Sequence, residues 1–511
     1  MKDFLKTGWQ LWVSLNAKVD DLAIQFLDEL VFSQYADEFI DSYDPSVIGS
    51  SLGSARLGFL PDELLLAIFT QFVMDCNSPW HLTLVCRRWR ALALGAAALW
   101  TDITLSDSPP SNAHGIDVWR IHHRIRLVSR GSTTVCETPP VFEDALKRAR
   151  SAPLRLAVRL SQQNINDLKN WYSVLAQSKG VSVRTLEFDT SPFGVGFLTA
   201  LCQSVEVRNL EQVVTYAPRG LPPLLITALQ TGQRLTSLNV PFELFLRLDR
   251  DDVGLHLRLK ELATGFPARN LADFDNVISK YQKLHRLRIP FGIWPGCRSP
   301  HIKLPLLETL STQCSPCHLG KVDFPVLQTF FITINDRECL CRYQATASYC
   351  FPCLTELNIV PTQETDTAWI RDMKVPSLER IAFDGESFPA DPPVVLPAVP
   401  RLKYFLMATI AAFPLSDETF RSMSSVENVI LFSLSDDLVL YEQTLYALFM
   451  DMPCPRLRTL TIGTVPHFSI HIDLYLKQVV RSSARRPPLL EHIDVLWKDY
   501  GLHRYSVDPD D

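Results

Sequence analysis

Apolar residues recur at helical spacing near the amino end of the chain, between residues 57 and 105. One stripe predicts a helix that begins at Pro61, where the missing backbone N–H costs nothing, and a second stripe predicts a helix that begins after Ser78. These stripes are Leu64, Leu65, Ile68, Phe69 and Phe72, then Leu82, Val85, Trp89 and Leu92. So small a unit cannot bury all its apolar surface, which leaves some for a partner or for the rest of the chain.

From about Leu154 onward the chain repeats a strand pattern in which apolar residues occupy the first, fourth and sixth positions. Copies occupy residues 183–188, 234–240, 283–289, 306–312, 326–332, 353–359, 377–383, 401–407, 425–431, 456–462 and 489–495. Between Leu307 and Val426 successive copies are 20 to 27 residues apart, which is typical of leucine-rich repeats that stack into a curved parallel sheet. A plain α/β domain is the alternative, because the usual turn asparagine is mostly missing and the spacing is irregular before residue 284.

The first region resembles an F-box from end to end. The resemblance rests on Leu60-Pro61-Asp62-Glu63-Leu64-Leu65 with Ile68-Phe69, on Val85-Cys86-Arg87-Arg88-Trp89 with Leu92-Ala93, and on Leu99-Trp100. It is close to the version found in F-box proteins with leucine-rich repeats, and the repeats, often led by proline, resemble the degenerate ones of fungal, mushroom-type F-box proteins. The loop from Met74 to Trp80 departs from the pattern, because Ser-Pro-Trp-His replaces the usual Asp-Leu helix start.

The resemblance implies that this region binds the adaptor subunit of a cullin-type (SCF) ubiquitin ligase, and through it a cullin. By position, the contacts or their immediate support would be Leu60, Pro61, Leu64, Ile68, Val85, Cys86, Trp89 and Trp100.

These patterns together predict an α + α/β chain, in which a small all-α F-box precedes an irregular leucine-rich-repeat solenoid with a curved parallel sheet. The expected parts are an N-terminal helical segment (1–45), a linker (46–56), the F-box (57–105), a linker with connecting helices (106–150), the repeat domain (151–505) and an acidic tail (506–511).

Side chains between the apolar positions of each repeat are expected on the open face of the sheet. An apolar patch there, for a substrate protein of unknown identity, would contain Phe331, Tyr404, Leu406, Ile430 and Phe432. The alternatives are that the strand register differs by one residue, which would bury these side chains, or that a loop or the N-terminal helices cover them.

Composition narrows the classes of partner. The net charge is −6 and the pI is near 6.1, which argues against a general nucleic-acid binder. No apolar run approaches the roughly 18 residues that cross a bilayer, and Asp3 and Lys6 interrupt what would otherwise be a signal peptide. Twelve cysteines in such a chain fit reduced thiols in the cytoplasm or the nucleus, and no membrane partner is expected.

A cluster of cysteines suggests a metal site, but the spacing of the cysteines argues against one. Cys314-Ser-Pro-Cys317-His318 matches a haem-attachment pattern, which requires export, and two Cys-x-x-Cys pairs could supply a zinc site. The second pair is Cys350 and Cys353; 32 residues separate it from the first, and a predicted strand, 326–332, lies between them. We therefore expect no metal and no cofactor.

No nucleophile elbow, phosphate loop or His-Glu-x-x-His helix is present, so the chain is not expected to be an enzyme. The favoured interpretation is a substrate-recognition subunit of the ligase, which accelerates ubiquitin transfer by proximity alone. The alternative is a protein-interaction scaffold that binds the adaptor outside ubiquitination.

Overall fold

The computed structural model of the chain divides into two compact units, residues 1–207 and 208–511. The described residues are 61–74, 79–84, 86–106, 134–136, 139–159, 181–188, 192–204, 207–215, 221–251, 254–264, 277–293, 302–314, 322–334, 349–360, 368–385, 399–409, 423–433, 454–465, 470–481, 487–497 and 501–507, with a few isolated positions between them. The predicted N-terminal helical segment (1–45), the linker that follows it and most of the acidic tail lie outside these ranges.

The first unit begins with four short helical elements. They are α3 (Asp62–Met74), α4 (Pro79–Leu82), α5 (Arg87–Gly95) and a 3₁₀ helix, η2 (Ala97–Trp100). The prediction of one continuous helix through Leu82, Trp89 and Leu92 is wrong. The Thr83 hydroxyl donates to the Trp80 carbonyl at 2.7 Å, and the Cys86 sulfur caps the next helix by accepting from the Trp89 amide at 3.5 Å. These local bonds satisfy backbone groups outside a helix and so separate α4 from α5.

A small parallel sheet follows directly in the same unit. Strand β1 (Asp102–Ser106) lies between β2 (Thr134–Cys136) and β3 (Leu154–Arg159), and β4 (Val183–Phe188) pairs with β3. The helices of this part are α7 (Pro139–Ala149) and α9 (Pro192–Ser204). Sheet structure therefore starts at the end of the helical cluster, and the segment 106–150 contributes β2 and α7.

The second unit contains a long parallel-rich sheet. Its strands pair in chain order: β5 (Gln212–Thr215), β6 (Ser237–Val240), β7 (Glu261–Thr264), β8 (Arg286–Ile293), β10 (Thr309–Cys314), β12 (Thr329–Ile334), β14 (Glu356–Val360), β16 (Arg380–Gly385), β17 (Tyr404–Thr409), β18 (Asn428–Ser433), β19 (Thr459–Val465) and β20 (His492–Trp497). The antiparallel strand β21 (Gly501–Ser506) then pairs with β20.

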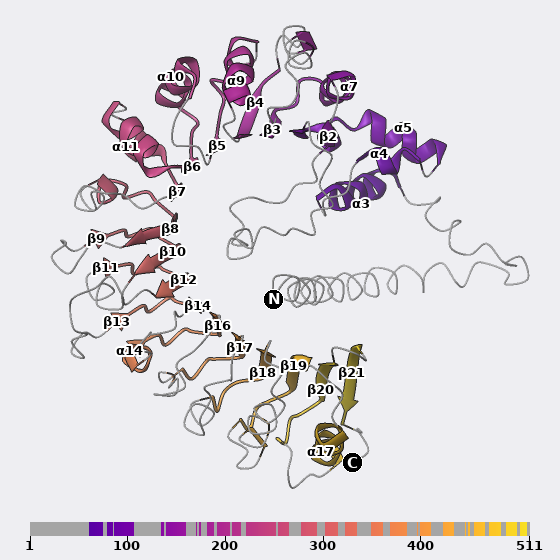
Figure 1. Cartoon of the computed structure of the whole chain (residues 1–511), viewed down its shortest axis with the longest axis vertical. Coiled ribbons are helices and arrows are strands. Elements are labelled where there is room, and N and C mark those ends of the chain that lie inside the picture. The colour runs from indigo at the N-terminus through magenta and orange to yellow at the C-terminus, as the bar shows by residue number, and fades with distance from the viewer. Residues whose placement is uncertain are drawn as a thin grey trace, which may run out of the picture. The chain divides into compact units, whose positions relative to one another are not determined.

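Helices and minor strands fill the connections of this unit. The helices are α10 (Pro223–Thr231), α11 (Phe242–Asp251), α12 (Leu255–Arg258), α14 (Ala368–Arg371) and α17 (Ile470–Arg481). The minor pairs are β9 (Ile302–Lys303) with β11 (Val322–Asp323) and β13 (Tyr349–Cys350) with β15 (Met373–Lys374). In Figure 1 α10, α11, α14 and α17 lie along one side of the run of strands.

Alternate side chains of the long sheet enter the core. In β12 the buried residues are Phe330, Ile332 and Ile334, whereas Thr329 and Phe331 between them are half-buried. The predicted period-2 frame is therefore the observed one, and a one-residue shift of register is excluded at this strand.

Within the regular run from β5 to β20, the two strands β5 and β7 were missed because threonine occupies a core position in each. Thr215 in β5 and Thr264 in β7 are 1% and 2% exposed and stand at the sixth position of the pattern, where the prediction required an apolar residue. With both strands included, the starting leucines Leu210, Leu235, Leu259 and Leu284 are 25, 24 and 25 residues apart. The irregular spacing before residue 284 thus disappears.

Backbone hydrogen bonds join the residues at the start of each strand to the residue just before the preceding strand of the sheet. The Glu379 carbonyl accepts from the amides of Lys403 and Tyr404, and the Lys403 carbonyl accepts in turn from Glu427 and Asn428. The same two-to-one pattern recurs at the strands from β6 to β20. These bonds satisfy backbone groups that would otherwise be unpaired, so the sheet needs no turn asparagine.

Proline occupies the turn that precedes several of these strands. In Phe351-Pro352-Cys353-Leu354 the Leu354 amide donates to the Phe351 carbonyl, which makes Pro352 the second residue of a four-residue turn. Proline suits that position because its ring presets the backbone angle φ. The prolines at 325, 376, 400 and 455 stand in equivalent turns.

Candidate functional site

Helix α3 carries two apolar stripes that face in different directions. Leu65 and Phe69 are fully buried, whereas Leu64 and Ile68 are 51% and 43% exposed. Each pair is four residues apart, so each forms one stripe on the helix surface. The exposed stripe, which Pro61 extends at its amino end, is apolar surface that the described part of the unit leaves open.

Helix α5 is held against α3 at two points. The ring centres of Phe69 and Trp89 are 4.7 Å apart, and the Arg88 guanidinium donates to the Asp62 carboxylate at 2.6 Å. The ion pair is half exposed, so it is worth less than about 1 kcal/mol and mainly sets the orientation of the helix ends. The half-buried ring of Trp89 therefore packs against the buried stripe of α3 through Phe69.

The remaining predicted adaptor-binding residues differ in exposure. Cys86 is exposed, although its sulfur is used as a helix cap, and Trp100 is fully buried. Trp100 therefore belongs to the support of the site rather than to its surface. Leu60 and Val85 lie outside the described residues.

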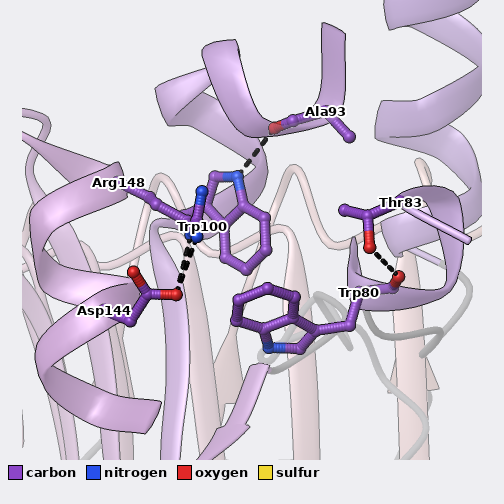
Figure 2. Close-up of polar contacts among 6 residues, drawn as sticks. All are labelled: Trp80, Thr83, Ala93, Trp100, Asp144 and Arg148. Atoms are coloured by element: carbon purple, nitrogen blue, oxygen red, sulfur yellow. Dashed lines mark hydrogen bonds and ion pairs between the residues drawn. The ribbon is translucent and has the colours of Figure 1, made fainter. Parts of the chain in front are cut away.

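Trp100 is fixed by a cluster that joins the helices to the rest of the unit (Figure 2). Its indole nitrogen donates to the Ala93 carbonyl at 2.8 Å, and its ring meets that of Trp80 edge to face. The Arg148 guanidinium of α7 lies 5.0 Å from the ring centre of Trp80 and 5.2 Å from that of Trp100, and Asp144 accepts from it at 2.8 Å. Trp80, Trp100, Arg148 and Asp144 are called the tryptophan clamp below.

One exposed apolar residue of the helical cluster was missed by the sequence analysis. Leu84, in the turn between α4 and α5, is 74% exposed. A continuous helix, as predicted, gave no indication that Leu84 would be exposed. Its exposure follows from the break between α4 and α5.

The long sheet brings the predicted substrate-binding residues onto one face. Register places Phe331, Asn358, Ala382, Leu406 and Ile430 side by side on successive strands, and this set, which is apolar except for Asn358, is called the apolar row below. Tyr404 stands in the adjacent row and is 40% exposed. The backbone of Phe432 pairs with Ala408, but its side chain lies outside the described residues.

A titratable pair lies at the start of the first unit's sheet. The Arg155 guanidinium donates to the Asp102 carboxylate at 3.2 Å, across the registered strands β1 and β3. Burial raises the pKa of Asp102 to about 6, assisted by the charge of Glu187 and opposed by that of Arg155. The pair therefore links the registered strands β1 and β3.

The cysteine cluster is only partly described. Cys350 and Cys353 are exposed, and the side chains of Cys314, Cys317, His318, Cys339 and Cys341 lie outside the described residues. Within the described ranges, histidine, cysteine, aspartate and glutamate form no group of three or more that could hold a metal ion.

Comparison with known proteins identifies the helical cluster. Residues 57–106 match the family model described as F-box-like, so the chain carries an F-box-like domain. No curated protein matches the chain. Among the described helices, none has the length and apolar character that a bilayer crossing requires.

Proposed function

We propose that this chain is a substrate-recognition subunit of a cullin-type ubiquitin ligase, in which the F-box-like domain binds the adaptor and the second unit binds a substrate protein. The observation that carries the proposal is the exposed stripe of α3, Leu64 and Ile68, within residues that match an F-box-like family. Apolar residues exposed at helical spacing are typical of a helix that packs against another protein.

We infer further that the second unit is a leucine-rich-repeat solenoid. Its parallel strands follow one another in register, and most of the repeats are close to 24 residues long. Each repeat is hydrogen-bonded to its neighbour, because one backbone carbonyl before a strand accepts from two amides before the next strand. Such bonding is expected of a structure in which no repeat closes a core alone. Its open face would hold the substrate close to the ubiquitin-conjugating enzyme.

The proposal requires no catalytic side chain, because holding two reactants together already supplies a large rate gain. It places the protein in the cytoplasm or the nucleus, where reduced cysteines persist.

Adaptor binding is tested by surface plasmon resonance between the full chain and purified adaptor. Leu64→Asp and Ile68→Asp would each bury an unpaired carboxylate in the interface, so we expect affinity to fall about 100-fold or more. Leu474→Asp is the matched control, because Leu474 is a 57% exposed leucine on α17 in the second unit. Unchanged affinity in the α3 variants, or an equal loss in the control, would refute the assigned interface.

Ubiquitin transfer is tested separately with the reconstituted ligase and a protein that copurifies with the chain. Transfer that depends on Leu64 supports the ligase function. Adaptor binding without any transfer would favour the scaffold function outside ubiquitination.

A further inference from the structure

An exposed arginine borders the apolar row of the long sheet. The Arg380 guanidinium lies 5.1 Å from the ring centre of Tyr404, its registered neighbour on β17. Arg380 itself is exposed, and two residues further along the same strands Ala382 and Leu406 stand side by side in the apolar row. A guanidinium that lies over an aromatic ring is attracted to the ring face, and it can still donate N–H groups to an incoming group.

Arg380 differs from other arginines of the same face. Arg286, in the same row, pairs with Glu261 at 2.9 Å, whereas Arg380 has no ion pair with any residue that the structure describes. Its registered neighbour Glu356 accepts from Asn358 at 3.3 Å instead. The face therefore presents an oriented cation beside apolar surface.

We propose that this face binds an extended substrate segment in which an acidic side chain stands two positions from an apolar one. The carboxylate would accept from the Arg380 guanidinium, and the apolar side chain would pack on the half-buried Leu406 and Ile430. The inference deepens the proposed function and depends on it for the identity of the ligand as a ligase substrate.

Strand geometry supplies the two-residue spacing. Side chains two positions apart in an extended peptide point the same way and are roughly 7 Å apart. The step between the Arg380 row and the apolar row is also two residues along a strand, so one extended segment reaches both.

Charge selects a carboxylate rather than a phosphate. Phosphorylated motifs are usually held by clusters of arginines. Arg380 stands between an acidic and an aromatic neighbour, Glu356 and Tyr404, which suits a single negative charge.

The test uses the full chain, immobilised without adaptor, and a phage-displayed library of random peptides, while adaptor affinity is measured separately. We expect the wild type to enrich peptides with Glu or Asp two positions from Leu, Ile or Phe. Synthetic versions of an enriched peptide with Lys in place of the acid should bind about tenfold more weakly or worse. Enrichment without an acidic position, or no enrichment, would overturn the inference.

Charge reversal separates recognition from simple damage to the fold. Arg380→Glu should switch the enriched residue from acidic to basic, which a misfolded variant cannot do. Arg458→Glu is the control, because Arg458 is an exposed arginine that pairs with Glu491 at the entry to β19. An unchanged preference in Arg380→Glu, or tighter binding of a phosphoserine peptide than of the glutamate peptide, would contradict the proposal.

The adaptor measurement keeps this inference distinct from the proposed function. If the wild-type chain shows no acidic preference but binds the adaptor normally, the inference alone is refuted. A retained preference in a chain that binds no adaptor refutes the ligase function and leaves the assigned peptide-binding face in place.

Discussion

The indole rings of Trp80 and Trp100 meet edge to face, with their centres 4.6 Å apart and their planes 73° apart. Trp80 lies in α4, within the segment in which the sequence departs from the usual F-box pattern, and Trp100 ends the helical cluster. The departure therefore has a structural use: it provides the second aromatic face over which Arg148 lies.

Truncation of Trp80 should loosen the cluster. In Trp80→Ala the clamp loses an aromatic contact and half of its cation–π surface, so we expect local stability to fall by about 2 kcal/mol. Hydrogen exchange of the peptides that cover α5 and η2 measures the change, with faster exchange expected. Trp80→Phe keeps an aromatic face and should exchange at an intermediate rate; equal rates in all three proteins would contradict this role.

Arg148 should act through its flat guanidinium as well as its charge. Arg148→Lys keeps the charge but loses the planar group over two rings, so we expect a loss of about 1 kcal/mol in the same exchange experiment. Lys147→Arg on the neighbouring, exposed position is the control and should have no effect. The role would be refuted if lysine at position 148 restored full protection.

Asp102 should make stability depend on pH. Its pKa is about 6 in the folded chain, above the ordinary 3.8, so the folded state holds the proton more tightly than the unfolded state does. The contribution is complete below the ordinary value and is lost as pH rises through about 6. The free energy of unfolding of the wild type relative to Asp102→Asn should therefore fall by up to about 3 kcal/mol between acid and neutral pH. Urea titrations of both proteins measure it, and parallel pH curves would exclude the effect.

The cysteines should separate by reactivity. Burial raises the pKa of the Cys202 thiol to about 11 and that of Cys454 to about 12, which suppresses the nucleophilic thiolate. Cys350 and Cys353 are exposed. Brief alkylation of the native chain followed by peptide mass spectrometry should modify the exposed pair and spare the other two until denaturant is added. Early modification of Cys454 would show that its turn opens readily.

Thr264 should be replaceable by an apolar residue. Its side chain is 2% exposed and stands at a position of the repeat pattern that other repeats fill with an apolar residue. Thr264→Val removes a buried hydroxyl at nearly constant volume, so we expect stability to stay equal or rise by about 1 kcal/mol. The registered partner Val240 offers the reverse change, and Val240→Thr should cost about 1–3 kcal/mol in a urea titration. A large loss in Thr264→Val would reveal a partner for the hydroxyl.

The sequence by itself determined most strands of the long sheet and where α3 and α4 begin, but not the start of α5 or the strands β5 and β7. Every strand pattern predicted between residues 183 and 495 overlaps an observed strand, because alternation of apolar and polar residues is a local property. The register of Phe331, Leu406 and Ile430 followed from the same frame. The F-box-like match covers 57–106, one residue beyond the predicted domain.

Only the tertiary structure decided which apolar residues are left open and which polar ones are enclosed. Leu64 and Leu65 are adjacent and chemically identical, yet one is half exposed and the other fully buried, because only Leu65 faces the rest of its unit. Thr264 is buried in the core, and the Arg148 guanidinium lies over the rings of Trp80 and Trp100. Both arrangements depend on segments that are far away in the sequence. Burial and pairing depend on those distant neighbours, whereas the strand and helix patterns depend only on near ones.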